Sequence, residues 1–278
     1  MEPPRSRSYG RGMLGTARTV GDHLREWRQR RRMSQLDLAC EAEISTRHLS
    51  FMETGRAQPS REMVLHLADQ LSIPLRERNV ILVAAGFAPV FPERPLDDPA
   101  LQAARRAVEV ILAGHEPYPA LVVDLRWNLV AGNRALAPLL EGVAPELLAA
   151  PTNVMRLALH PQGLAPRIVN LAEWRLHLLE RLRRQVDLTA DPGLIALVEE
   201  LKSYPTPPAP DRRPEDFGGV ATPLQLLNGD SVLSFYSTTT VFGTAVDITL
   251  SELTLETFFP ADPATAETLR QLQAARGD

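Results

Sequence analysis

Hydrogen-bonding and aromatic side chains gather in one short segment of this 278-residue chain, at Thr46, Arg47, Ser50 and Phe51. At helical spacing these positions share one face, away from the apolar positions of the same segment. An arginine can donate two hydrogen bonds to O6 and N7 of guanine, a contact worth roughly 1–3 kcal/mol of base discrimination. The segment therefore has the chemistry of a helix whose first turns reach base edges in the DNA major groove.

Other polar residues of this region admit two interpretations each. Phe51 either contacts a thymine methyl group or packs against the loop that follows it. Arg56 and Arg61 flank that loop, where they either approach phosphates and make the affinity salt-dependent or remain solvated charges. His48 is expected to make a backbone contact or to be solvated, and is not expected to bind a metal.

The elements that must position these residues are two short helices joined by a tight turn, in the segment SQLDLACEAEISTRHLSFMETG, residues 34–55. Ser34 is expected to cap the first helix, with Asp37 completing a capping box. Ser45 is expected to cap the second helix. This arrangement predicts a helix-turn-helix.

Apolar spacing predicts how the helix-turn-helix packs into a larger domain. Leu36 and Ala39 are expected to lie on one face of its first helix, and Ile44 to be the buried plug of the turn. Further helices are expected over about residues 20–32, 60–71 and 74–85. Five helices of this kind predict a self-contained, all-α domain.

Changes in composition divide the chain into four segments. Residues 1–18 are rich in Arg, Ser, Gly and Pro and are predicted to be a disordered arm, and residues 19–87 form the helical domain. The four prolines of APVFPERPLDDP predict a linker over residues 88–99. Residues 100–278 predict an α+β domain, in which a small antiparallel sheet has helices inserted between its strands. Its strands are expected within residues 120–125, 128–132, 223–227, 231–242 and 245–259, and its helices near residues 101–113, 133–141, 152–159, 167–186, 192–202 and 263–275.

Charge is divided unequally along the chain. Residues 1–90 contain 14 arginines and 10 acidic residues, a net of +4, whereas the remainder contains 16 basic and 24 acidic residues, a net of −8. The basic part contains the helix-turn-helix, so the acidic part is expected to point away from DNA phosphates. The single cysteine, Cys40, fits a reducing cytoplasm. No apolar run approaches the roughly 20 residues of a membrane helix, so we expect a cytoplasmic, nucleoid-associated protein without membrane contact.

Two sets of motifs resemble one family of bacterial regulators. The first set is SQLDLA, STRHLSFMETGR, PSREMVLHLA and PLRERNVILVAAGFAP, and the second is HPQGLAPRIVN, EWRLHLLERLRRQ, DPGLIALVEEL and FYSTTTVFGTAVDITLSEL-x-x-E-x-FFPAD. Across residues 20–275 the chain resembles phage-repressor-like (XRE) regulators of the MmyB-like subfamily. This resemblance implies an all-α, five-helix, lambda-repressor-like DNA-binding domain followed by an α+β PAS-like ligand-binding domain, in a dimeric protein.

The resemblance also implies roles for individual residues. Gln35 is expected to donate its amide to a phosphate, and Arg28 and Glu53 correspond to a buried ion pair. Glu43 and Arg32 stand where relatives usually have glycine, so a left-handed conformation there would cost on the order of 1 kcal/mol. The candidate DNA-binding residues are Ser34, Gln35, Ser45, Thr46, Arg47, Ser50, Phe51, Arg56 and Arg61.

The second domain lacks the sequence motifs of serine hydrolases, P-loop proteins and dinucleotide-binding enzymes, so we expect neither catalysis nor a cofactor. His160 and His177 have no clustered cysteines or carboxylates around them, so no metal site is expected. Large apolar side chains with a few polar ones predict instead a ligand pocket, although the same residues could simply form the core. The candidate ligand-binding residues are Trp127, Asn128, Asn133, Leu157, Trp174, Phe235 and Tyr236.

Few ionisable groups lie on the apolar faces of the second domain, which favours an apolar or amphipathic, fatty-acid-like ligand. Arg181, Arg183 and Arg184 are expected on the outer face of a long helix, either solvated or in contact with an anionic ligand or a second subunit. The whole sequence predicts a dimeric, sequence-specific transcription regulator, expected to be a repressor, whose two recognition helices lie about 34 Å apart on a near-palindromic operator. Two alternatives are open: the second domain is a protein-interaction module, or it is an enzyme that the helix-turn-helix localises.

Overall fold

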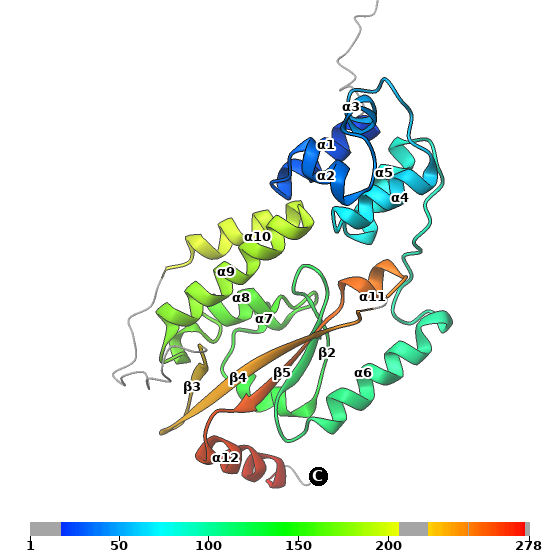
Figure 1. Ribbon diagram of the computed structural model, residues 1–278. Coiled ribbons are helices and arrows are strands. Elements are labelled where there is room, and N and C mark those ends of the chain that lie inside the picture. The colour runs from blue at the N-terminus through cyan, green and yellow to red at the C-terminus, as the bar shows by residue number, and fades with distance from the viewer. Residues whose placement is uncertain (1–17, 206–221, 244, 276–278) are drawn as a thin grey trace, which may run out of the picture. The chain divides into compact units, whose positions relative to one another are not determined.

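The computed structural model describes residues 18–205, 222–243 and 245–275, in two compact units, Met1–Val90 and Phe91–Asp278 (Figure 1). The first unit is helical and the second combines helices with an antiparallel sheet, so the fold class predicted from the sequence is confirmed. Except for Arg18, the predicted N-terminal arm lies outside the described residues.

The described part of the first unit forms five helices. Four of them begin at a serine or threonine whose hydroxyl oxygen accepts a hydrogen bond from a backbone N–H three residues later, at 3.1 to 3.2 Å. Capping boxes with Asp22 and Asp37 complete two of these N-termini. The helices are α1 (Val20–Arg30), α2 (Gln35–Glu41), α3 (Thr46–Glu53), α4 (Arg61–Gln70) and α5 (Leu75–Ala84).

The buried face of α2 differs from the one expected. Leu36 is 60% exposed, whereas Leu38 and Ala39 are buried against the neighbouring helices together with Ala42. The expectation that Leu36 faces the interior is therefore wrong. The buried face of α2 is instead the one that contains Leu38, Ala39 and Ala42. Ile44, in the turn that follows, is half-buried.

The five described helices of the first unit all end in the same motif. After each helix comes one residue in the left-handed conformation, with φ between 47° and 85°. The N–H of the following residue donates to the carbonyl five positions earlier, at 2.8 to 3.1 Å, as in a Schellman cap. The left-handed residues are Arg32, Glu43, Gly55, Ser72 and Gly86. The two positions where glycine was expected from the family pattern are thus left-handed.

Helix α1 approaches the C-terminal end of α3 closely at Gly21. A Cβ atom added to Gly21 would lie 2.6 Å from the carbonyl oxygens of Met52 and Glu53. Only a glycine lets α1 come this near to the end of α3.

The second unit contains a five-stranded sheet in the order β2-β1-β5-β4-β3, with antiparallel pairing between all neighbours. The strands are β1 (Ala120–Val123), β2 (Leu129–Gly132), β3 (Leu224–Asn228), β4 (Ser231–Val241) and β5 (Thr254–Pro260). The helices are α6 (Gln102–Gly114), α7 (Pro145–Leu148), α8 (Val154–Leu159), α9 (Leu171–Thr189), α10 (Pro192–Ser203), α11 (Ile248–Glu252) and α12 (Pro263–Ala274), with short 3-10 turns at Pro99–Leu101, Arg134–Leu140 and Ala165–Arg167.

The sheet has a core on each face, as the alternation of its strands requires. Leu121 and Val123 belong to the larger core, which also includes residues of α8, α9 and α10. Ala120 and Val122 point to the other face, into a smaller core with α6. In Figure 1, α9 and α10 accordingly lie on one side of the sheet and α6 on the other.

Two segments differ from the sequence-based expectation. The predicted strand over residues 245–259 is instead the short helix α11 followed by β5, because Asp247 caps a helix by accepting from the N–H of Thr249 at 2.9 Å. Part of the expected linker is bound to the second unit: the N–H of Ile248 donates to the carbonyl of Pro92 at 2.8 Å, and the Thr249 hydroxyl donates to that of Arg94 at 2.6 Å.

Candidate DNA interface and ligand cavity

The outer face of α3 contains the residues expected to read bases. Leu49, Met52 and Glu53 are buried, whereas Arg47 is exposed and Ser50 is half-buried on the other side of the helix. The hydroxyls of Ser34 and Ser45 act as N-caps, each accepting a backbone N–H at 3.1 Å. These two serines therefore fix where α2 and α3 begin.

The ring of Phe51 is close to two guanidinium groups. The Cζ atoms of Arg47 and Arg56 lie 5.2 and 5.8 Å from the centre of its ring. Cation–π contacts at exposed sites are worth about 0.5–1 kcal/mol each, enough to bias the orientation of a flexible side chain. Phe51 thus links Arg47 on the helix to Arg56 in the loop after it.

Glu53 ties together three helices. Its carboxylate accepts two hydrogen bonds from Arg28 of α1, at 2.7 and 2.9 Å, and one from the amide of Gln35 of α2, at 2.8 Å. Burial raises the pKa of Glu53, but these hydrogen bonds outweigh it and the pKa is lowered. The Gln35 amide expected on a phosphate is here engaged inside the protein.

An apolar cavity of about 390 Å³ lies in the larger core of the second unit. Its walls come from the β1–β2 hairpin, the 3-10 turn after β2, α8, α9 and strands β3 to β5. Trp127, Leu157, Trp174 and Phe235, four of the predicted ligand residues, line it.

The three other predicted ligand residues do not line this cavity. Asn128 donates to Asp124 at 2.9 Å, and Asn133 donates to the carbonyl of Tyr118 at 2.7 Å and accepts the N–H of Ala120 at 3.0 Å. Both asparagines therefore hold the hairpin together. Tyr236 lines a separate, open cleft.

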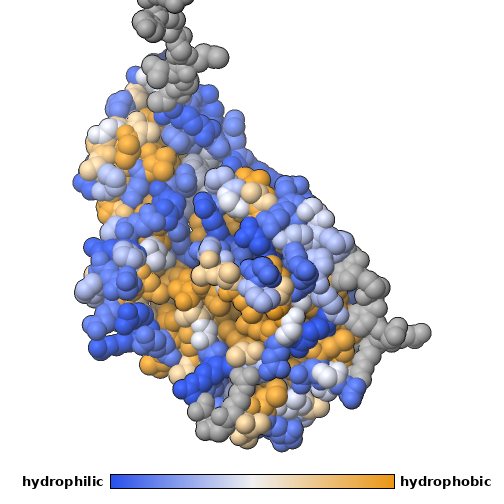
Figure 2. All heavy atoms as spheres, turned by 180° about the vertical axis from the view of Figure 1, so that it is seen from behind, coloured by the Kyte–Doolittle hydropathy of each residue, from blue (hydrophilic) through white to orange (hydrophobic). Residues whose placement is uncertain are grey.

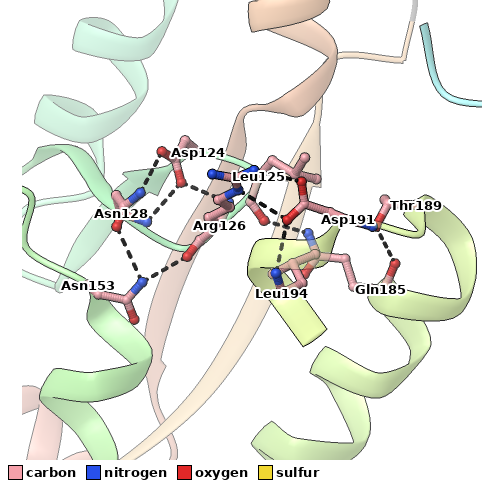
Figure 3. A network of polar contacts seen from close by, with 9 residues as sticks. All are labelled: Asp124, Leu125, Arg126, Asn128, Asn153, Gln185, Thr189, Asp191 and Leu194. Carbon is pink, nitrogen blue, oxygen red and sulfur yellow. Dashed lines mark hydrogen bonds and ion pairs between the residues drawn. The ribbon is translucent and has the colours of Figure 1, made fainter. Parts of the chain in front are cut away.

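The turn between β1 and β2 is anchored to three helices (Figure 3). Arg126 pairs with Asp191, the N-cap of α10, at 3.0 Å, and its carbonyl accepts from Asn153, the N-cap of α8, at 2.8 Å. Gln185 of α9 donates to the carbonyl of Leu125 at 3.0 Å. These contacts hold the next residue, Trp127, at φ 67°, which is uncommon for a bulky side chain.

Trp127 is also fixed at its ring. Its indole N–H donates to Gln185 Oε1 at 2.7 Å, and the guanidinium of Arg181 lies 4.4 Å from the ring centre. The indole therefore forms a firm boundary between the apolar cavity and the open cleft, both of which it lines.

Two residues beside the cavity, Glu256 and Arg181, differ from the sequence-based expectation. Arg181, expected on the outer face of its helix, points inward, donates to the Thr239 hydroxyl at 2.6 Å and forms an ion pair with Glu256. Glu256 lines the apolar cavity. The available signal in the sequence was an acidic residue inside a predicted strand, two positions before Phe258, which lines the same cavity.

Hydrophobic side chains also reach the surface of the second unit. On the face shown in Figure 2 they gather over a broad area bordered by hydrophilic residues. No helix among the described residues has the length and apolarity needed to cross a membrane. The same residues contain no group of three or more His, Cys, Asp or Glu side chains arranged to hold a metal ion.

Comparison with known proteins agrees with this two-part structure. A model described as a helix-turn-helix domain matches residues 19–80, and the model of the MmyB-like transcription regulator ligand binding domain matches residues 104–272. A search of curated proteins finds no match. The fold and these domains define a DNA-binding transcription regulator with a domain for a small-molecule ligand. The chain belongs to the MmyB-like family of transcription regulators.

Proposed function

We propose that this regulator is a homodimeric repressor whose DNA affinity is controlled by a small apolar or amphipathic molecule. The observation that supports this most directly is the apolar cavity of about 390 Å³ in the same chain as a helix-turn-helix. Its volume falls within the roughly 300–1,000 Å³ of small-molecule pockets. In this proposal the chain acts in the cytoplasm at the nucleoid and is not an enzyme.

On the DNA side, Thr46, Arg47 and Ser50 read base edges. Arg47 is exposed at the start of α3, and its contact with Phe51 restrains its guanidinium before DNA arrives. Arg56, in the loop after α3, and Arg61, at the start of α4, are exposed and contribute phosphate contacts. Ser34, Gln35 and Ser45 act by positioning α2 and α3, with their helix N-termini toward the phosphates.

On the ligand side, Trp127, Leu157, Trp174 and Phe235 contact the apolar body of the ligand. The lining is almost entirely aliphatic and aromatic, which suits an alkyl chain such as that of a fatty-acid-like molecule. The ligand acts on DNA binding only if it favours one arrangement of the two domains, residues 19–87 and 100–278, over another.

Selection of bound duplexes from a randomised DNA pool by the full chain tests the DNA proposal. The expected product is an inverted repeat with half-sites centred about 10 base pairs apart, one helical turn. A selected pool without an inverted repeat contradicts the dimer. Reporter transcription from the selected site, with and without the chain, then distinguishes a repressor from an activator.

A further inference from the structure

The apolar cavity contains one ionisable side chain among its described lining residues, Glu256. Glu256 lies on β5, the middle strand of the sheet, and its side chain is 8% exposed. Its Oε1 atom is paired with the guanidinium of Arg181. A carboxylate can accept hydrogen bonds from more than one donor, so Glu256 can still accept one from an occupant of the cavity that it lines.

Other polar groups at the cavity wall are already engaged within the protein. The Thr152 hydroxyl donates to the carbonyl of Leu148 at 2.8 Å, and the Trp127 indole donates to Gln185 at 2.7 Å. Glu256 is therefore where a polar end of an occupant gains most from a hydrogen bond.

The charge beside Glu256 is already balanced. Arg181 contacts the carboxylate and is itself held by the Thr239 hydroxyl, opposite Glu256 in the strand pairing, and by the ring of Trp127. A ligand carboxylate would place a like charge next to Glu256, and a ligand ammonium would bring a cation that finds its counter-charge already paired. Burial also raises the pKa of Glu256 despite Arg181, so a second anion there is disfavoured further.

We infer that the cavity binds an apolar molecule with a neutral hydrogen-bond-donating headgroup, such as a hydroxyl or an amide, which donates to Glu256. This inference rests on the proposed ligand-binding function and specifies its ligand class. The inferred ligand has the alkyl body of the fatty-acid-like molecule expected above, but its headgroup is neutral and not a carboxylate.

Calorimetric titration of the full chain with four ligands of one chain length tests the headgroup. The probes are decanol, decyl methyl ether, decanoic acid and decylamine, each below its micelle-forming concentration. Decanol is expected to bind roughly tenfold more tightly than each of the others, because only it combines a donor with zero charge. Equal or tighter binding of the acid, the amine or the ether overturns the inference but leaves the proposed function standing, whereas no binding by any probe overturns both.

The variant Glu256→Gln tests whether this side chain determines which headgroup binds. Its loss of charge is expected to remove most of the tenfold disadvantage of decanoic acid relative to decanol. The matched control is Glu267→Gln on α12, where the carboxylate forms a surface pair with Arg270 and both side chains are 56% exposed. Unchanged probe order in Glu256→Gln overturns the inference. If that variant fails to fold by circular dichroism, the four titrations of the unmodified chain still decide.

Discussion

Arg47 and Arg61 are both exposed arginines, yet their positions predict different kinds of DNA contact. Arg47 lies in the first turn of α3, and Arg61 begins α4 beyond the loop. We expect Arg47→Ala to lose roughly 1–3 kcal/mol of discrimination at one base position. Arg61→Ala should weaken binding to all sequences evenly and reduce the slope of affinity against salt by about one.

Fluorescence anisotropy with the selected operator, single-base variants of it and a range of salt concentrations measures both effects. A uniform loss in Arg47→Ala, or a base-dependent loss in Arg61→Ala, would show that the roles are wrongly assigned.

Glu53 makes the stability of the first unit depend on pH. Because its pKa is lowered in the folded state, its contribution is fully present above the unfolded value of about 4.3 and is lost as pH falls through the folded value. Glu53→Gln leaves Arg28 buried without a counter-charge and is expected to cost roughly 3 kcal/mol.

Hydrogen exchange of the amides in α1 and α3, followed as a function of pH, measures this contribution. The acid-range loss of protection should disappear in Glu53→Gln. The control Asp69→Asn breaks a pair whose carboxylate side chain is 63% exposed, and it should cost at most about 1 kcal/mol. Equal costs in the two variants would falsify the role given to Glu53.

At the scale of elements, the repeated helix ending makes Glu43 the position to test. Its φ of 53° is a left-handed conformation that glycine adopts more easily. Glu43→Gly is therefore expected to stabilise the first unit by about 1 kcal/mol. Gly55→Ala, at the equivalent position after α3 with φ 72°, is the matched control and should destabilise it by a similar amount. Chemical denaturation of both variants gives the two signs, and the same sign for both contradicts this account.

Local chemistry explains why much of the fold could be predicted from the sequence. Serine caps and apolar spacing located the helices of the first unit, and short strand-like runs located four of the five strands. The prediction that Leu36 is buried was wrong because a short helix has two possible apolar faces. Packing against the neighbouring helices determines which face is buried. The strand predicted over residues 245–252 was wrong. The β-branched residues there favour a strand, but the Asp247 cap and the contacts with residues 92–94 favour the helix α11.

The candidate site could be predicted where it depends on a contiguous sequence motif. It could not be predicted where it depends on contacts between segments that are distant along the chain. The position of α3 follows from its motif, whereas Glu256 meets Arg181 only through the register of β4 and β5 and the packing of α9 on the sheet. Asn133 looks like a ligand group in the sequence because nothing local shows that its amide donates to the carbonyls of Leu112 and Tyr118. Asn128 looks like one because its bond to the Asp124 side chain depends on the turn between the two residues.

At the scale of the whole molecule, ligand and DNA must influence each other equally. If a bound ligand weakens operator affinity tenfold, the operator must weaken ligand affinity tenfold, a coupling of about 1.4 kcal/mol. Titration of decanol into the full chain, with and without saturating operator, measures this coupling. Identical decanol affinities in the two titrations would mean that the cavity does not control DNA binding.

The position of Trp127 has an optical consequence. The chain has three tryptophans, of which Trp127 and Trp174 line the cavity and Trp27 is buried in the first unit. Indole emission responds to the polarity around the ring, so an occupant that replaces water in the cavity changes the colour and intensity of the natural fluorescence. The intrinsic fluorescence of the unmodified chain therefore reports occupancy of the cavity. In Trp27→Phe, the emission would come only from the two tryptophans that line the cavity.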